Sequence, residues 1–423
     1  MDETQVILSK VDENEVIGLT SDLVKIRSIS HEPPYERDVA KYLAAYWQQL
    51  GLEVHIQEVE KNRPNVIGIL RGEGDGPTLM FEGHQDTNMV GSGWTRDPFG
   101  GEIDREQGWI YGCGSVNMKQ SLAAYTTAVH AIIKSRVKLL GNIMLAATVK
   151  EIINHEGARF MIDSGIRPDV CILGEPTCSE IQIAHTGSFR FEIITRGTLL
   201  HISTVYSPTE VFPPDKRINA IYKSIEIVNR LRHFETEKIL SFREHPIVGS
   251  PVLIIGYIEG GHAEKPGFSA EECRIAGDIR YVPGMTYEQI ENDLEEFISQ
   301  LMKDDHQLEA KIIARPESRY TTPIEVSSEE YIVKAIIKAH RQAYGTHPTV
   351  GAGFPHRYHQ NESSLWVNMA GVPTPNYGAG GSEGVTKPDE RISISELINI
   401  TKAYALAAMD VCSKTKTDLE EQH

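Results

Sequence analysis

Residues 78–86 read TLMFEGHQD, an apolar run that gives way to a histidine and an aspartate two positions apart. Three further runs have the same character: NVIGIL at 65–70, NIMLAATV at 142–149 and VCILGEP at 170–176. Continuous apolar runs of this length are typical of strands covered by helices on both faces. Apolar residues at helical spacing precede the runs, at about 35–50, and lie between them, at about 118–134 and 157–163. The pattern predicts an α/β domain, a sheet with helical cover.

Residues 189–316 show a different order of predicted strands and helices. The expected strands are 189–195, 251–258, 273–282 and 308–316, and the expected helices are 215–234 and 286–302. This β-α-β-β-α-β order is that of a ferredoxin-like α+β module. The first helix is expected to carry one apolar face, made of Ile218, Ile221, Ile225, Val228 and Leu231. The simplest organisation is a small domain at 189–316 inserted into a larger one made of 1–188 and 317–423.

Composition narrows the class of protein. The chain has 423 residues and a formal net charge of −17, which argues against nucleic acid or an anionic membrane as the main partner, because such surfaces need clustered Lys and Arg. No apolar stretch approaches the length of a bilayer span, and the acidic N-terminal segment lacks the features of a secretory signal. The five cysteines include no CxxC pair, which suits reduced thiols. We therefore expect a cytoplasmic protein that acts on a small molecule.

Ionisable residues follow three of the predicted strands. His84 comes after the first apolar run, Glu151 after the run at 142–149, and Glu175 after the run at 170–173. Ligands of open α/β sheets bind at the carboxyl ends of strands, so these residues should converge in space. Any one of them alone would more often be a solvated loop residue. Three together, with Asp86 beside His84, favour a site.

Longer motifs surround these residues. GHQDT (83–87), GCGSVNMK (112–119), DIRYVPG (278–284) and PDERISI (388–394) occur in order along the chain. Together they resemble the two-zinc amidohydrolase and exopeptidase family that includes acetylornithine deacetylase, aminoacylase and carboxypeptidase G. The resemblance implies a mixed-sheet, zinc-exopeptidase-like catalytic domain, with the inserted domain acting as a lid that also makes a homodimer or higher homo-oligomer.

The resemblance also implies a ligand set, from which this chain departs. One metal of the family would be held by His84 and Glu175, and the carboxylate that bridges the two metals falls on Asn117. The ligands of the other metal fall on Ile152, which has no donor atom, and on Thr386, a neutral hydroxyl. We therefore expect one divalent ion per subunit (Mn, Zn or Co). Whether His155, His356 or His359 replaces a lost ligand stays open, as does the identity of the metal.

The catalytic groups implied by the resemblance are retained. Glu151 falls on the family's general base, and Asp86 on the residue that orients the metal-binding histidine. His201 corresponds to a histidine that reaches the site of a neighbouring subunit, and Arg280 would pair with a substrate carboxylate. A catalytically inactive binding or assembly homologue is the alternative. Random loss of an unused active site would not be expected to retain Glu151 or to remove the ligands of one metal only, so an enzyme is favoured.

The expected reaction is hydrolysis of a C–N bond in a small carboxylated substrate. Losing one metal weakens the electrophilic pull on an amide carbonyl, which an activated substrate tolerates best. The resemblance suggests one such case: deamination of an electron-poor aromatic amine, 5-nitroanthranilate, to 5-nitrosalicylate and ammonia. The alternative is a one-metal deacylase of an N-acyl amino acid.

Overall fold

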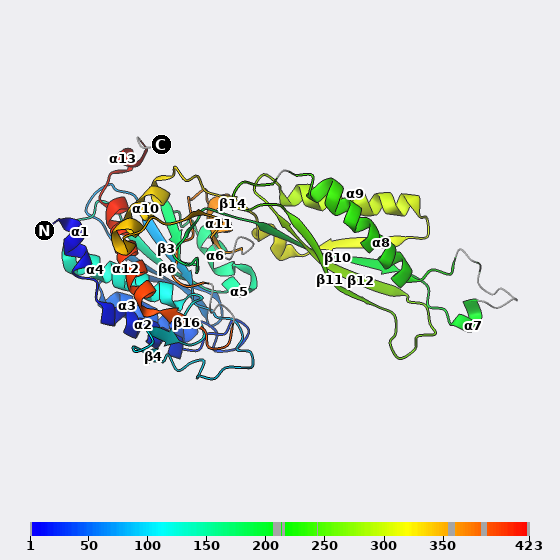
Figure 1. Cartoon of the computed structure of the whole chain (residues 1–423), viewed down its shortest axis with the longest axis horizontal. Coiled ribbons are helices and arrows are strands. Elements are labelled where there is room, and N and C mark those ends of the chain that lie inside the picture. Colours follow the sequence, from blue (N-terminus) through cyan, green and yellow to red (C-terminus); the bar gives the residue numbers. More distant parts are fainter. Residues whose placement is uncertain are drawn as a thin grey trace. The chain divides into compact units, whose positions relative to one another are not determined.

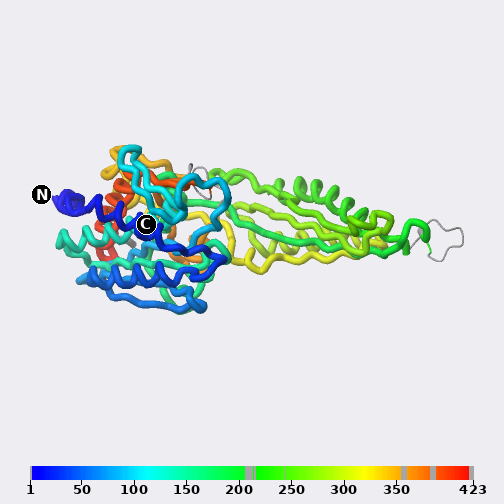
Figure 2. The backbone as a smooth tube through the Cα atoms, turned by 90° about the horizontal axis from the view of Figure 1, so that it is seen from below, coloured from blue at the N-terminus to red at the C-terminus, as the bar shows by residue number. Residues whose placement is uncertain are grey.

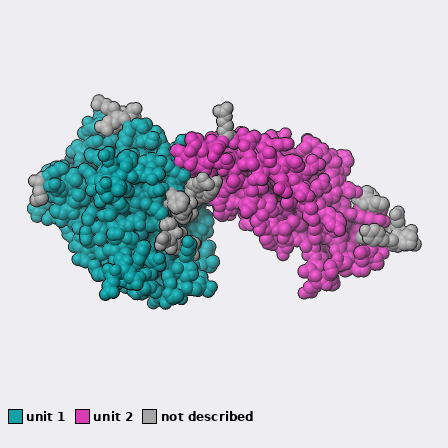
Figure 3. All heavy atoms as spheres, viewed as in Figure 1, with its two compact units in different colours: residues 1–184, 324–423 teal, residues 185–323 magenta. Residues whose placement is uncertain are grey.

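The computed structural model describes residues 2–205, 213, 216–242, 244–353, 360–381 and 387–420. The chain divides into two compact units, residues 1–184 with 324–423 (unit 1) and residues 185–323 (unit 2), coloured separately in Figure 3. In Figure 2 the chain leaves unit 1 once, in green, and returns to it in yellow. The sequence pattern places these boundaries at 189 and 316. The difference arises because β10 (Gly187–Arg196) already begins at Gly187 and because the 3-10 helix Pro316–Tyr320 contacts β10.

Unit 1 is built on a five-stranded mixed sheet with the order β1-β2-β6-β3-β7 (Figure 1). The strands are β1 (Glu53–Glu60), β2 (Arg63–Leu70), β3 (Leu79–His84), β6 (Ile143–Thr148) and β7 (Val170–Leu173). The three strands β6, β3 and β7 run parallel to one another, whereas β2 is antiparallel to both of its neighbours, β1 and β6. The predicted α/β class with a mixed sheet is confirmed.

The parallel strands decide where the polar residues gather. All six residues of β3 are buried, as the continuous apolar run predicts. His84 pairs with Thr148 at the ends of β3 and β6, and Glu82 pairs with Leu173 at the end of β7. Residues that follow these ends therefore meet at one edge of the sheet, as is usual for ligand sites in α/β folds.

Helices cover the sheet of unit 1 and supply most of its core. Apolar residues of α4 and α12 pack on β3, and an aromatic cluster marks the contact, with the ring centroid of Tyr125 lying 4.8 Å from Phe81 and 4.6 Å from Tyr404. The helices are α1 (Glu3–Leu8), α2 (Glu13–Lys25), α3 (Arg37–Gln49), α4 (Lys119–Ser135), α5 (Glu151–Asn154), α6 (Glu156–Asp163), α10 (Tyr331–Tyr344), α11 (Ser363–Asn368), α12 (Ile394–Cys412) and α13 (Lys416–Glu420).

Short strands complete unit 1. The three-stranded sheet β16-β5-β4 joins Arg391–Ser393, Trp109–Tyr111 and Ile103–Asp104, and β8 (Ile181–Gln182) pairs with β15 (Val350–Gly351). Two further short strands are β9 (Ala184–His185) and β14 (Ile324–Glu325). In the first of these sheets, β5, which precedes α4, pairs with β16, which precedes α12. Two segments that are far apart in sequence therefore lie side by side.

Unit 2 is a four-stranded antiparallel sheet with the order β11-β12-β10-β13 and two long helices, α8 and α9, on one face (Figure 1). Its elements are β10, α7 (Ile202–Val205), α8 (Ala220–Phe234), the π-helical turn Glu235–Ile239, β11 (Val252–Gly260), β12 (Glu272–Tyr281), α9 (Tyr287–Asp304) and β13 (Glu309–Ala314). The chain order β-α-β-β-α-β with the first strand of the module, β10, inside the sheet is that of a ferredoxin-like module, and this prediction is confirmed.

The apolar face predicted for α8 is wrong in part. The buried residues of α8 are Ala220, Ser224, Ile227, Leu231 and Phe234, so only Leu231 of the expected face is buried. Ile225 is 47% exposed, and its helical neighbour Tyr222 is 72% exposed. Ile221 of the expected face is half-buried and packs against the buried residues Ala220, Ala270 and Cys273, so the expected face coincides with the buried one only in part.

A search of the described helices for a membrane-spanning segment finds none with the required length and hydropathy.

Candidate metal centre

His84, Glu151 and Glu175 lie together at the carboxyl edge of the sheet of unit 1, and ligand atoms of all three fall within 4.8 Å of one another. Nε2 of His84 is 3.7 Å from Oε2 of Glu151 and 3.5 Å from Oε1 of Glu175. All three side chains are buried. The convergence expected from the strand ends is therefore present. Among the described residues this is the one such cluster of His, Cys, Asp and Glu.

Each ligand comes from a different element. His84 is the last residue of β3, Glu151 is the first of α5, and Glu175 follows β7. The chain can turn toward the cluster after β7 because residue 174 is glycine. A Cβ at Gly174 would lie 2.0 Å from the hydroxyl oxygen of Tyr125, closer than any real contact. The site thus depends on the packing of α4 behind it as well as on the strands.

The ring of His84 has a defined direction. Its Nδ1 lies 2.8 Å from the main-chain oxygen of Asp86, to which it donates, so Nε2 presents a lone pair to the cluster. The carboxylate of Asp86 is 3.6 Å from Nδ1. It accepts hydrogen bonds instead from the Ser30 hydroxyl at 2.7 Å and from the main-chain N–H groups of Glu151 and Ile152 at 3.2 and 3.1 Å. Asp86 therefore orients both His84 and the start of α5.

Asn117 joins the same group of acceptors. Its Oδ1 lies 3.0 Å from Nε2 of His84, and it is 7% exposed. The loop that carries it is held by Glu390, whose carboxylate accepts from the main-chain N–H groups of Val116 at 2.8 Å and Asn117 at 3.1 Å. An amide oxygen is a ligand that hard divalent ions accept, so Asn117 stands where the sequence predicts a ligand.

The chemistry of this cluster calls for a cation. Both carboxylate oxygens of Glu175 are buried without a hydrogen-bond partner. Burial raises the pKa of Glu175 to about 8, and the neighbouring charge of Asp86 adds to the shift. Burial likewise raises the pKa of Glu151 to about 8, with His84 acting in the opposite sense. A buried imidazole nitrogen and two buried carboxyl groups that converge on one point fit a divalent metal ion.

Two further buried carboxylates stand behind the cluster and escaped the sequence analysis. Glu82 accepts from the indole N–H of Trp366 at 2.5 Å, and Glu362 accepts from the Thr148 hydroxyl at 2.9 Å. Burial raises the pKa of Glu82 to about 8 and that of Glu362 well above its ordinary value. A glutamate inside the apolar run TLMFEGH was a detectable signal for Glu82. Glu362 had no such signal.

The positions of the lost ligands are partly described. Ile152 contributes only its main-chain N–H, which donates to Asp86. His155 lies with Nδ1 3.8 Å from Oε1 of Glu151 and is not a member of the cluster. Thr386, His356 and His359 fall outside the described residues.

The two remaining predicted site residues belong to unit 2. His201 is exposed; its Nδ1 lies 2.7 Å from the Ser203 hydroxyl, and its ring centroid lies 4.8 Å from that of Phe268. Arg280, on β12, pairs with Asp278 at 3.0 Å. Burial lowers the pKa of Arg280 from its usual range, and the pair with Asp278 acts in the opposite sense. The roles expected for both remain predictions.

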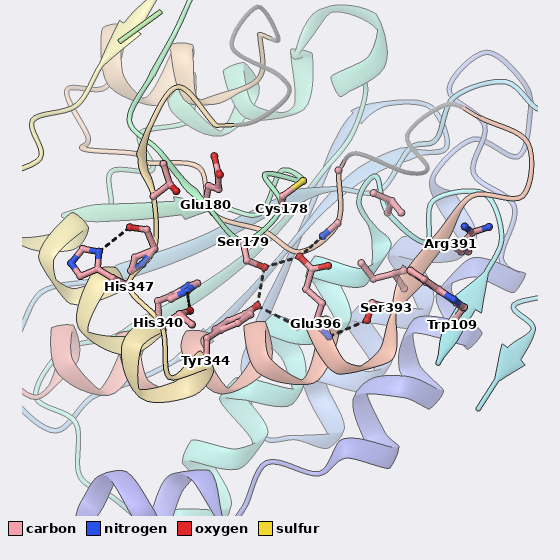
Figure 4. Close-up of a pocket in the computed structure, with 17 residues that line it drawn as sticks. Trp109, Cys178, Ser179, Glu180, His340, Tyr344, His347, Arg391, Ser393 and Glu396 are labelled. Atoms are coloured by element: carbon pink, nitrogen blue, oxygen red, sulfur yellow. Dashed lines mark hydrogen bonds between the residues drawn. The ribbon is translucent and has the colours of Figure 1, made fainter. Parts of the chain in front are cut away.

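Unit 1 also contains a cavity of about 560 Å³, shown in Figure 4. Ser179 lies at its centre, with its hydroxyl 2.8 Å from that of Tyr344 and 2.7 Å from Oε1 of Glu396. His84, Glu151 and Glu175 are not among its described lining residues. Ser179, Tyr344 and Glu396 thus hydrogen-bond to one another, and the cavity does not include the metal cluster.

Comparison with known proteins adds sequence relatives. The model of peptidase family M20/M25/M40 matches residues 80–410. An N-formyl-4-amino-5-aminomethyl-2-methylpyrimidine deformylase of Halalkalibacterium halodurans is 24% identical over 435 residues, covering 97% of this chain and 98% of its own. An acetylornithine deacetylase of Proteus mirabilis is 32% identical over 266 residues, covering 61% and 63%.

Solved structures agree on the fold. A tripeptidase of Staphylococcus aureus superposes with a TM-score of 0.75 at 18% identity, covering 96% of this chain and all of its own (100%). The aminopeptidase PepT of Bacillus cereus gives a TM-score of 0.74 at 19% identity, with coverage of 96% and 100%.

Proposed function

Because the chain belongs to peptidase family M20/M25/M40, whose members are metal-dependent hydrolases of C–N bonds, we propose that it hydrolyses a C–N bond of a small carboxylated substrate with one divalent metal ion and Glu151 as general base. The observation that carries the proposal is the buried group of acceptors formed by His84, Glu151 and Glu175. His84, Glu175 and Asn117 would hold the ion. When bound, it would acidify a water molecule and polarise the bond under attack.

The side chains of the site have separate roles in this reaction. Glu151 would take a proton from the attacking water and deliver it to the leaving nitrogen. Asp86 keeps Nε2 of His84 directed into the site through its main-chain oxygen. The buried surroundings exclude other water and strengthen each of these polar interactions.

One metal rather than two follows from the donor count. A second ion in the family arrangement would need donors at Ile152 and Thr386 and a bridging carboxylate at 117. Ile152 has no side-chain donor, and residue 117 is an uncharged amide. Manganese, zinc and cobalt all accept ligands of these types; amide and carboxylate oxygens favour a harder ion such as manganese over thiophilic ones.

An N-acyl amine is the substrate class that the relatives support. The deformylase matches almost the whole chain, and the acetylornithine deacetylase has a higher identity, 32% against 24%, over a shorter length. Both names denote removal of a small acyl group from nitrogen. A one-metal centre with a single base suffices for such a hydrolysis, because attack and protonation of the leaving nitrogen use the same carboxyl group.

A second candidate is hydrolytic deamination of an electron-poor aromatic amine such as 5-nitroanthranilate. The observation in its favour is the apolar Ile152 beside the base, where a second ion would otherwise assist an unactivated amide. In such a substrate the ring accepts the charge of the attacking water, so less electrophilic help is needed. The product would be a phenol with ammonia, in place of an amine with a carboxylic acid.

Unit 2 would act as lid and dimerisation domain in this proposal. The strand β11 lies at the edge of its sheet; Ile254 (63%) and Ile258 (50%) on this strand are exposed, and so are Tyr222 and Ile225 of α8. An unpaired edge strand with exposed apolar residues favours association with a second copy. In the dimer, His201 would donate to the charge that develops on the substrate, and Arg280 would bind its carboxylate.

A product-resolved assay tests the proposal. Manganese-loaded protein should be incubated with N-formyl and N-acetyl amines, with and without a carboxylate, and with carboxylated nitroanilines. Release of formate or acetate supports the deacylase, and release of ammonia with loss of the aromatic amine supports the aminohydrolase. If the manganese-loaded protein turns over none of these compounds, both proposed activities are refuted, and the alternative of a catalytically inactive homologue is favoured.

A further inference from the structure

A buried ion pair lies behind the proposed general base. Arg63, the first residue of β2, donates from Nε to Oε2 of Glu36 at 2.8 Å and from a terminal nitrogen to Oε1 at 2.9 Å. The side chains are 5% and 0% exposed. The guanidinium carbon also lies 4.6 Å from the ring centroid of Tyr35. The pair is therefore bidentate, dry and fixed on one side by an aromatic ring.

This pair is joined by hydrogen bonds to the start of α5. Glu36 Oε1 accepts from the main-chain N–H of Lys150 at 3.3 Å, while Asp86 accepts from those of Glu151 and Ile152. Three consecutive N–H groups around the base are thus held by two buried carboxylates. Arg63 connects the two, because it donates to the main-chain oxygen of Ser30 at 2.6 Å and the Ser30 hydroxyl donates to Asp86 at 2.7 Å.

The backbone that this network holds is not a relaxed one. Lys150 has φ of +62°, in the left-handed region that residues other than glycine rarely adopt. The turn directs the chain from the end of β6 into α5, so that Glu151 enters the metal cluster. Strained backbone of this kind persists only where surrounding contacts determine it. Here Glu36 and Asp86 supply such contacts from one side.

We infer that Glu36 and Arg63 are positioning residues for hydrolysis, which set the main chain at 150–152 and so aim the carboxylate of Glu151 at the metal-bound reactants. The inference rests on the proposed function of Glu151. A buried ion pair is weak evidence for stability, because desolvation offsets much of its attraction. Its bidentate geometry, in contrast, fixes the carboxylate of Glu36 relative to β2, and this carboxylate in turn holds the main chain next to Glu151.

The test uses two variants of the full-length, manganese-loaded protein. Glu36→Gln keeps the shape of the side chain and unpairs Arg63. The double variant Glu36→Leu/Arg63→Met replaces both charges by apolar groups of similar size, so that folding does not have to tolerate a lone buried charge. The matched control is Asp410→Asn, which breaks the pair of Asp410 with Lys338 between α12 and α10, away from the cluster.

Positioning and purely structural roles differ in what they change. We expect kcat per folded molecule to fall about 10- to 100-fold in both variants, with KM and manganese affinity changed less than about threefold. Asp410→Asn should lower Tm and leave kcat per folded molecule unchanged. Wild-type kcat in the double variant, once corrected for the folded fraction, would overturn the inference.

Amide hydrogen exchange provides a measurement that does not depend on activity. The N–H groups of residues 150–152 should exchange at least about tenfold faster in the double variant, while those of β6 stay protected. Unchanged exchange at 150–152 would overturn the inference even if catalysis were impaired. A wild-type protein without any turnover would refute the proposed function alone, and the exchange result would still decide whether the ion pair fixes this segment.

Discussion

Nε2 of His84 and Oδ1 of Asn117 lie 3.0 Å apart, and with the His84 proton on Nδ1 both atoms are acceptors. Two acceptors at this distance repel unless a cation lies near them. The proposed metal ion, bound by both atoms, would remove this repulsion, and the neutral amide at 117 would then set how tightly the ion is held.

Asn117→Asp should strengthen metal binding. The substitution adds one negative charge to a buried ligand set and changes few atoms, and ligand charge is a main determinant of affinity for divalent ions. We expect manganese affinity to rise about tenfold or more, measured by competition with a chelating indicator. Asn117→Ala should lower it, and equal affinity in all three proteins would remove Asn117 from the ligand set.

Wild-type protein should hold at most one ion per chain, and should hold it weakly. Elemental analysis after dialysis against a chelator is expected to show well under one ion, with activity restored by manganese or a similar cation. Retention improves when a carboxylate-bearing substrate is present. Two ions surviving dialysis would mean that His155, His356 or His359 has rebuilt a second site.

Glu151→Gln should abolish most turnover and leave substrate binding largely intact. The amide keeps the shape of the side chain but cannot accept the proton, so kcat should fall by about 10²- to 10⁴-fold with a small change in substrate affinity. Binding is measured by calorimetry on the inactive variant. Activity within a few-fold of wild type would exclude Glu151 as the base.

The metal-free protein should lose stability as the pH rises from about 5 to 8. Burial raises the pKa of both Glu151 and Glu175 to about 8 in the folded chain, whereas an unfolded chain releases these protons near 4.3. Between these values the folded state binds more protons, so unfolding becomes easier with each rise in pH. A bound cation stabilises the ionised carboxylates and removes this penalty.

The corresponding measurement is Tm with manganese and with chelator, at pH 5.5 and pH 8. The increase in Tm on adding manganese should be larger at pH 8. An increase that is equal at both values, or larger at pH 5.5, would contradict the raised pKa values of these buried carboxyl groups.

Hybrid dimers test the role proposed for His201. His201→Ala and Glu151→Gln proteins should each be inactive, and a mixture should regain activity if one subunit completes the site of the other. Each mixed dimer has one intact site, so random exchange of equal amounts should restore about a quarter of the wild-type sites. Absence of any rescue, with subunit exchange confirmed by a tagged partner, would argue against a shared site.

The meeting of His84, Glu151 and Glu175 was predictable because each follows an apolar run, and parallel strands end at one edge. The network behind them was not. Glu36 and Arg63 are 27 positions apart, and neither stands in a periodic pattern, so only packing brings them together. The error in α8 has a related cause. Periodicity finds apolar residues at helical spacing but does not say which surface they meet, and Ile225 lies on the side away from the sheet.

Trp366 gives the site a built-in optical probe. Its indole is fully buried (0% exposed) and donates to Glu82, a carboxyl group whose ionisation is coupled electrostatically to that of Glu175. Binding of the proposed metal ion would change the field around Glu82 and therefore the emission of this indole. Fluorescence of Trp366, isolated by replacing the other three tryptophans, would follow occupancy of the centre in real time, without substrate and without knowing which substrate the protein uses.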